Sequence, residues 1–131
     1  MPPPMTVTEA IHQAEVILPG IPAPEGELDP RWQAIIAVAE FIEDEPEAVC
    51  SFAERWGQHP NEDLRVAIAT CVLEHLLEHH FDLVFPRAER LARSSRRFAQ
   101  TVAMCWRFGE SEHPANAAKL DELLRELRSA T

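Results

Sequence analysis

The sequence has 131 residues, of which 46% are hydrophobic and 26% are charged, and its formal net charge is −10. It is too apolar for a disordered chain and too poor in cysteine for a disulfide scaffold, and its length suits one domain, residues 1–131. Its longest apolar run, residues 34–39, is too short to span a membrane, and the first nine residues show no feature of a secretory signal. We therefore expect a soluble cytoplasmic domain whose acidic body disfavours broad binding to nucleic acids.

Helical periodicity dominates the sequence, and no segment shows the alternation that is typical of a strand. The first predicted helix covers residues 7–18 and begins after Thr6, which stands in capping-box spacing with Glu9. Residues 19–29 contain three prolines and two glycines and are typical of a connector. We expect residues 1–18 to form a capping helix at this end of the domain.

Two further helices are predicted before residue 57. Asp29 and Pro30 provide an N-cap and a first-turn proline for the second helix, which is expected to extend to about Glu43. The third helix covers residues 46–56, and Gly57 is expected to end it in the left-handed conformation.

Four more helices are predicted in the second half of the chain. They cover residues 62–80, 85–93, 96–108 and 114–128. Asn61 is the N-cap of the first of these four, and Ser94 or Ser95 is the N-cap of the third. The second, fourth and sixth helices of the chain are apolar on nearly every face, so each must be covered on both sides.

Three segments of these apolar helices are similar to one another at spacings of 32 and 34 residues. They are WQAIIA (32–37), LRVAIA (64–69) and FAQTVA (98–103). The alignment places Ile36, Ile68 and Val102 at one equivalent position, with small residues at fixed offsets as close helix packing requires. We therefore expect these three residues to occupy equivalent surroundings in a stack of helix pairs.

Residues 48–76 resemble a HEAT repeat, the helix–turn–helix unit of α-solenoids. An amphipathic first helix is followed by a polar turn that contains Asp63, then by Arg65 and an alanine-rich second helix. In HEAT repeats an acidic turn residue and an arginine often brace adjacent turns. Here Gln33 and Ala99 stand at the positions that match Arg65, so only the middle repeat has both residues.

The resemblance covers residues 30–128, and the chain is similar to small bacterial HEAT-like proteins. It implies an all-α fold, a short α-solenoid of about three HEAT-like helix pairs and roughly seven helices, closed by a C-terminal capping helix. It also implies that the chain binds other macromolecules through the surface of the helical stack, and that it lacks catalysis, as most proteins of this kind do.

Acidic and histidine residues gather between residues 74 and 82. His75 and His79 are four residues apart, so their rings can meet on one helix face near Glu78, which is a possible zinc or nickel geometry. The order differs from HExxH and no distant ligand is identifiable, so the alternative is the polar end of a helix that leaves the core. We favour this alternative and expect neither a metal nor another cofactor.

Six arginines and one acidic residue occupy residues 86–109. The candidate partner-binding residues among them are Arg87, Arg90, Arg93 and Arg97. Arginine forks match carboxylate and phosphate groups, so this stripe can receive an acidic partner. The alternative, which we favour, is internal pairing with glutamates of the preceding helices, such as Glu54.

Most aromatic residues stand at helical spacing and are expected in the core. Trp56 and Trp106 lie near predicted helix ends, where a partly exposed indole can anchor a partner. Cys50, Cys71 and Cys105 form no CxxC pair, and we expect them to be small buried hydrophobic residues rather than nucleophiles.

The sequence contains no glycine-rich phosphate loop, nucleophile elbow or paired-carboxylate motif. It therefore predicts a non-catalytic protein-binding module, such as an adaptor, a regulator or an immunity-type partner that neutralises a basic toxin, and a monomer or small homo-oligomer. Two alternatives are a metal-dependent enzyme that uses His75 and His79, and a nucleic-acid-binding module that uses the arginines of residues 87–97.

Overall fold

The computed structural model describes residues 5–20, 23 and 26–129, and all regular secondary structure in these residues is helical. The all-α class predicted from the sequence is therefore confirmed. Residues 1–4, 21–22, 24–25 and 130–131 lie outside the described residues, and with them parts of the predicted capping segment and connector. No helix in the described part of the chain combines the length and the apolar character that crossing a membrane requires.

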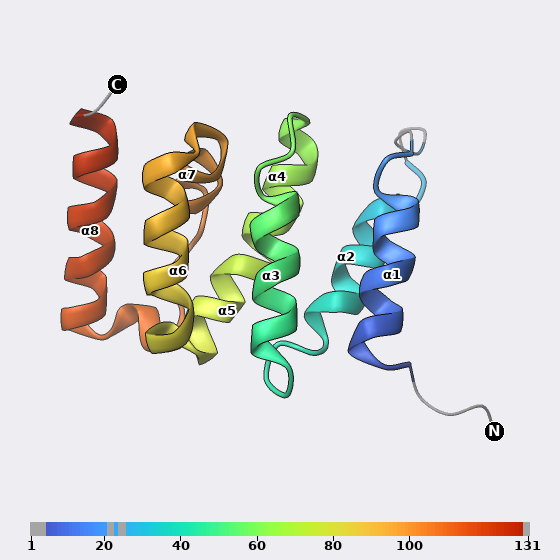
Figure 1. Ribbon diagram of the computed structural model, residues 1–131, viewed down its shortest axis with the longest axis horizontal. Helices are drawn as coiled ribbons and strands as arrows, with labels where there is room; N and C mark the ends of the chain where they lie inside the picture. The colour runs from blue at the N-terminus through green and yellow to red at the C-terminus, as the bar shows by residue number, and fades with distance from the viewer. Residues whose placement is uncertain (1–4, 21–22, 24–25, 130–131) are drawn as a thin grey trace.

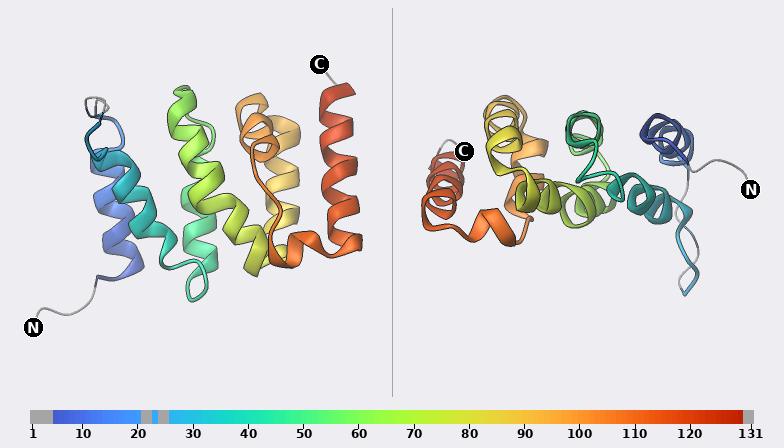
Figure 2. Two further views of the ribbon diagram at one scale, coloured as in Figure 1. Left: turned by 180° about the vertical axis from the view of Figure 1, so that it is seen from behind. Right: turned by 90° about the horizontal axis from the view of Figure 1, so that it is seen from below.

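The helices form two layers, and within each layer they follow the order of the chain (Figures 1 and 2). The first layer contains α1 (Val7–Ile17), α3 (Pro46–Trp56), α6 (Phe81–Ser94) and α8 (Pro114–Ser129). The second layer contains α2 (Pro30–Ala39), the continuous segment α4 (Glu62–Ile68), η1 (Ala69–Leu73) and α5 (Glu74–His79), and α7 (Arg96–Ala103). The helices α1, α3 and α6 are each paired with the second-layer helix that follows, whereas no such helix follows α8 within the described residues.

Four helices begin at the N-caps that the sequence predicts. The side chain of Thr6 accepts a hydrogen bond from the amide of Glu9 at 3.2 Å, as the capping-box spacing indicates. The three second-layer helices use Asp29, Asn61 and Ser95, whose side chains accept from backbone amides of the first turn at 2.8–3.2 Å. These caps are 32 and 34 residues apart, so the second-layer helices start in the register of the sequence repeat.

The predicted end of the second helix and the predicted conformation of Gly57 need correction, whereas the third helix has the predicted bounds, Pro46–Trp56. α2 ends at Ala39 rather than Glu43, because the amides of Phe41 and Ile42 bond to carbonyls three residues back and turn the chain. Gly57 ends α3 with a φ of −68°, so it is not in the left-handed conformation. Instead, a Cβ at Gly57 would lie 2.9 Å from the ring of Phe98. This glycine therefore allows α3 and α7 to approach closely.

Two boundaries in the second half were also predicted wrongly. α6 begins at Phe81 rather than at residue 85, because the carboxylate of Glu110 accepts a hydrogen bond of 2.9 Å from the Phe81 amide. Pro86 consequently lies inside α6. α7 ends at Ala103, and residues 104–108 form a loop instead of its last turns.

The long second-layer segment contains one wide turn. The π-helical η1 separates α4 from α5, and the thiol of Cys105 donates a weak hydrogen bond to the Ala69 carbonyl within it (3.7 Å). A π turn changes the direction of a helix, and Figure 2 shows that the segment bends at this place. The bend brings α5 against α6 and against the short 3₁₀ helix η2 (Gly109–Glu112).

The expectation that Ile36, Ile68 and Val102 have equivalent surroundings is wrong for Ile36. Ile68 and Val102 are buried, but Ile36 is 42% exposed and its neighbour Ile35 is buried instead. At this level of α2 the residue that enters the core is Ile35, so the alignment of the three segments does not predict which isoleucine is buried in the first of them.

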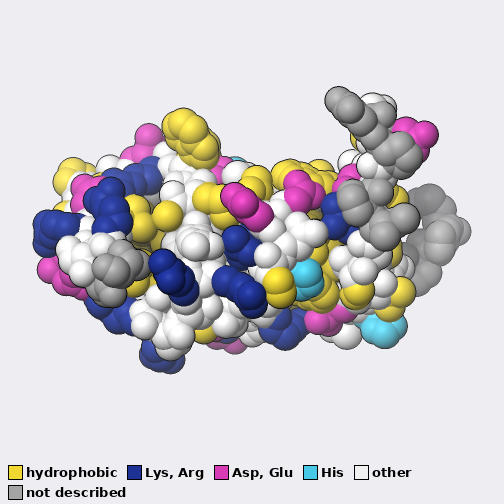
Figure 3. Space-filling model, turned by 90° about the horizontal axis from the view of Figure 1, so that it is seen from above, with side chains coloured by type: hydrophobic (Ala, Val, Ile, Leu, Met, Phe, Trp, Pro, Cys, Tyr) yellow, Lys and Arg dark blue, Asp and Glu magenta, His cyan; other side chains and the backbone are white. Residues whose placement is uncertain are grey.

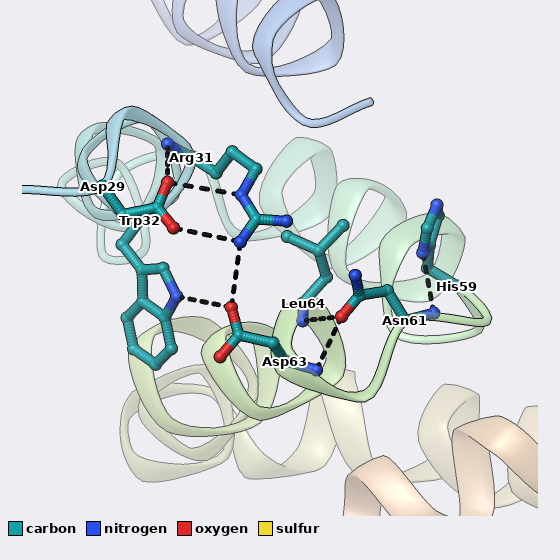
Figure 4. A network of polar contacts seen from close by, with 7 residues as sticks. All are labelled: Asp29, Arg31, Trp32, His59, Asn61, Asp63 and Leu64. Carbon is teal, nitrogen blue, oxygen red and sulfur yellow. Dashed lines mark hydrogen bonds and ion pairs between the residues drawn. The ribbon is translucent and has the colours of Figure 1, made fainter. Parts of the chain in front are cut away.

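Arg31 ties the first helix pair to the second (Figure 4). It is 2% exposed, and its guanidinium donates to the carboxylates of Asp29 (3.0 Å) and Asp63 (3.1 Å). The indole N–H of Trp32 donates to the same oxygen of Asp63 at 3.2 Å. The hydrogen bonds from Arg31 hold the pKa of Asp29 below its ordinary value. The acidic turn residue Asp63 is thus braced by an arginine of the preceding pair.

Arg65 links the second pair to the third. Its guanidinium donates to the carbonyls of His59 and Pro60, both at 2.9 Å, and to the side-chain oxygen of Gln100 at 3.0 Å. The hydroxyl of Thr101, which is fully buried, donates to the Gly57 carbonyl at 2.6 Å. These contacts hold α7 in a fixed position against the α3–α4 turn.

Candidate protein-binding surface

Two arginines of the predicted stripe are paired internally. The guanidinium of Arg87 pairs with the carboxylate of Glu54 and donates to the hydroxyl of Ser51 at 3.0 Å. Arg93 pairs with Glu126 at 2.6 Å and also reaches a second glutamate on α6. Arg87 thus pairs with a preceding helix, as the sequence analysis favoured, whereas Arg93 pairs within α6 and with the following helix α8.

Other arginines are exposed where α6 ends and α7 begins. Among the described residues, the guanidinium groups of Arg90, Arg96 and Arg97 make no hydrogen bond or ion pair. Figure 3 shows basic side chains gathered over this end of the molecule. The pKa of His59 is lowered, first by burial and then by the charge of Arg97 and two further arginines. This region is therefore a positive surface on an acidic protein.

The two candidate tryptophans differ in exposure. Trp56 is half-buried against the core and its ring stacks on His59, with 5.5 Å between the ring centroids. Trp106 is 70% exposed, more than any other aromatic side chain in the described residues. Trp106 is therefore the tryptophan that a partner can reach.

The backbone that carries Trp106 is anchored although its side chain is exposed. The carboxylate of Glu74 on α5, which is 5% exposed, accepts a hydrogen bond from the Trp106 amide at 3.0 Å. Two residues later, the ring of Phe108 stacks on His75 with 5.7 Å between centroids. These contacts hold the loop of residues 104–108 against α5.

Gly109 fixes the end of this loop. Its φ is +52°, in the region that favours glycine, and a Cβ at this position would lie 2.8 Å from the side chain of Glu78. The next residue, Glu110, caps α6 through the Phe81 amide. The loop between α7 and η2 is thus held at both ends and presents Trp106 in a defined place.

We predict that Glu74 makes the stability of the protein depend on pH. Burial raises the pKa of Glu74, so the unfolded chain releases this proton at lower pH than the folded protein does. Relative to Glu74→Gln, the wild type should therefore lose stability as the pH rises from below the ordinary pKa of glutamate to above the raised pKa of Glu74 in the folded protein. Urea unfolding of both proteins between pH 4 and 7 tests this, and a difference that is constant, or that changes in the wild type's favour, would contradict it.

A groove lies between α7 and α8, and we refer to it as the α7–α8 groove. It is lined by four apolar residues, one glutamine and two arginines: Ala99, Ala103, Leu124, Leu127, Gln100, Arg96 and Arg128. Its volume is about 310 Å³. A second hollow, between α4 and α7, shares Gln100 and Ala103 with it, so α7 forms a ridge between two depressions.

The histidine cluster is engaged in local contacts. Nδ1 of His75 lies 2.8 Å from a carboxylate oxygen of Glu78, and His79 lies 3.6 Å from the same oxygen and 3.5 Å from Glu43. In the described part of the chain, no group of three or more histidine, cysteine or acidic side chains is arranged to hold a metal ion. These contacts instead join α5 to the turn after α2 and to the loop that carries Trp106.

The cysteines lie where their thiols resist ionisation. Burial raises the pKa of Cys50 to about 11, and it also raises the pKa values of Cys71 and Cys105. Cys50 is buried as the sequence analysis expected, whereas Cys71 and Cys105 are only half-buried.

No model of a known protein family matches the chain, and no curated protein or solved structure is significantly similar to it.

The sequence analysis missed three residues of this surface. Arg96 belongs to the basic segment, but it was not among the arginines that the sequence analysis named as candidate partner-binding residues. Leu124 and Leu127 belong to the apolar residues of the last predicted helix, but they are only half-buried, and no second-layer helix follows α8 in the described residues. The one signal in the sequence for the contact between Glu74 and the Trp106 amide is the presence of an acidic residue within an apolar helix.

Proposed function

We propose that this chain is a non-catalytic protein-binding module of the cytoplasm, built as a short HEAT-like α-solenoid, and that Trp106 anchors its partner. Support for the solenoid comes from N-caps at spacings of 32 and 34 residues and from Arg31 and Arg65, which link successive helix pairs. An adaptor, a regulator or an immunity-type partner would each use such a surface.

The observation that carries the proposal is an exposed tryptophan on an anchored backbone. Tryptophan is enriched among the residues that dominate binding energy at protein interfaces. Because the Trp106 amide is already held by Glu74, little backbone freedom is lost when a partner packs on the indole. An exposed apolar ring in a fixed place is therefore favourable for binding.

We predict that Trp106→Ala weakens binding of the native partner by about 2 kcal/mol, or roughly thirtyfold in affinity. The measurement is quantitative mass spectrometry of proteins that co-purify with the wild type and with the variant. Leu28→Ala is the matched control, because Leu28 is an exposed apolar residue in the connector, at 80% exposure.

Partners that are retained by the wild type and by Leu28→Ala but lost with Trp106→Ala would support the proposal. Recovery of the same partners in the same amounts by all three proteins would show that Trp106 is not the anchor. A catalytic activity of the wild type that is retained in Trp106→Ala would contradict the proposal and would show that the protein is an enzyme.

A further inference from the structure

The α7–α8 groove occupies a place that is filled by a helix elsewhere in the stack. The first-layer helices α1, α3 and α6 each pack against a second-layer helix, but no helix in the described residues takes this position beside α8. The leucines that such a helix would cover, Leu124 and Leu127, are half-buried and line the groove. The facing residues of α7, Ala99 and Ala103, are small and one helical turn apart, which permits close approach of another helix.

The charge of the groove is opposite to that of the protein. The chain has a formal net charge of −10, yet the charged residues that line the groove are Arg96 and Arg128, and no acidic residue lines it. Arg97 adds a further exposed positive charge next to Arg96. An apolar stripe flanked by carboxylates is therefore complementary to this groove, whereas a basic segment is repelled.

We infer that the α7–α8 groove receives an acidic amphipathic helix of a partner protein. The apolar stripe of that helix packs on Leu124, Leu127 and the two alanines, and its carboxylates face Arg96 and the neighbouring Arg97, which are both exposed. This inference rests on the proposed protein-binding function and adds the chemistry of the partner. The volume of about 310 Å³ accommodates a few apolar side chains, and the body of the helix lies above them.

A second copy of this chain is a poor occupant. The opposite end of the stack is formed by α1, and most of the exposed residues of α1 are polar: Thr8, Glu9, His12 and Gln13. Val16, at 68% exposure, is the one large apolar residue of α1 that is exposed. Head-to-tail stacking would therefore cover the groove with a polar surface.

The test uses two labelled probe peptides and fluorescence anisotropy. One is a helical peptide of about 18 residues with leucine at every third or fourth position and glutamate on both sides of the stripe; the other has lysine in place of each glutamate. We expect the wild-type protein to bind the acidic peptide and to bind the basic one at least tenfold more weakly. Arg96→Glu should weaken binding of the acidic peptide about tenfold, and Ala103→Phe should do so by filling the groove.

The matched control is Arg90→Glu, which makes the same charge change at an exposed arginine of α6 outside the groove. Arg96→Glu leaves folding intact because a glutamate is favourable in the first turn of a helix. The inference would be overturned if the protein bound the two peptides equally, or if Arg96→Glu and Arg90→Glu had equal effects on peptide binding. It would also be overturned if the protein associated with itself and Ala103→Phe abolished this association. If the acidic peptide does not bind but partners that depend on Trp106 are still recovered, the groove proposal alone is rejected. If the acidic peptide binds but recovery of partners does not depend on Trp106, the proposed anchor alone is rejected.

Discussion

Replacing Phe98 by alanine is expected to lower the free energy of unfolding by about 3–5 kcal/mol. Phe98 is fully buried in the first turn of α7, and its ring contacts Gly57 at the end of α3. The loss combines the transfer free energy of the ring with the cost of the cavity, because the buried hydrogen bond from Thr101 to the Gly57 carbonyl prevents α7 from collapsing into it. Since small domains are stable by about 5–15 kcal/mol, this variant should be close to the limit of folding.

The matched control for this variant is Phe108→Ala, which truncates a phenylalanine that is 40% exposed. Urea unfolding of both variants provides the comparison, with unchanged slopes as the condition for a valid difference. Similar losses of stability in the two variants would mean that Phe98 does not lie in the core.

The second large effect is expected for Arg31→Ala, at about 2–3 kcal/mol of lost stability. Arg31 is buried, and its removal leaves the carboxylates of Asp29 and Asp63 without their partner between the first two helix pairs. The expected loss is below that of a fully buried pair because the Asp63 side chain is 54% exposed. In the wild type, Arg31 stabilises the ionised form of Asp29, so this contribution is present above the ordinary aspartate pKa and is lost as the pH falls.

Arg55→Ala is the control for the loss of an arginine from an ion pair. Arg55 pairs with Glu15 on the surface, where both side chains are well exposed, so we expect a change below about 1 kcal/mol. A double-mutant cycle of Arg31→Ala with Asp63→Ala should give a favourable coupling energy of about 1 kcal/mol. Zero coupling would show that the two helix pairs are not joined through these residues.

Local chemistry made part of this fold predictable. The caps Thr6, Asp29, Asn61 and Ser95 act on their own first turns, so their side-chain chemistry and spacing were enough to place four helix starts. The start of α6, which was missed, depends on a residue distant in sequence. α6 begins at Phe81 because Glu110 caps it, and no window around residue 81 contains that information.

Burial at the ends of the stack was equally beyond the sequence pattern. Ile36 and Ile68 look equivalent in the repeat, but only Ile68 is buried. At the other end of the molecule, no second-layer helix in the described residues follows α8, which leaves Leu124 and Leu127 half-buried beside the α7–α8 groove. Trp106 was predicted as an anchor from its place near a helix end, whereas the buried carboxylate that fixes its backbone became apparent only in three dimensions.

The most direct test of the binding function is photocrosslinking in living cells. The photoreactive residue p-benzoylphenylalanine replaces Trp106 in one variant and Leu28 in another, so that both probes start from exposed apolar positions of the same chain. We expect the probe at position 106 to form a discrete covalent adduct with a partner protein, and the probe at position 28 to form none. Absence of an adduct at position 106, or the same adducts from both positions, would contradict a binding surface centred on Trp106.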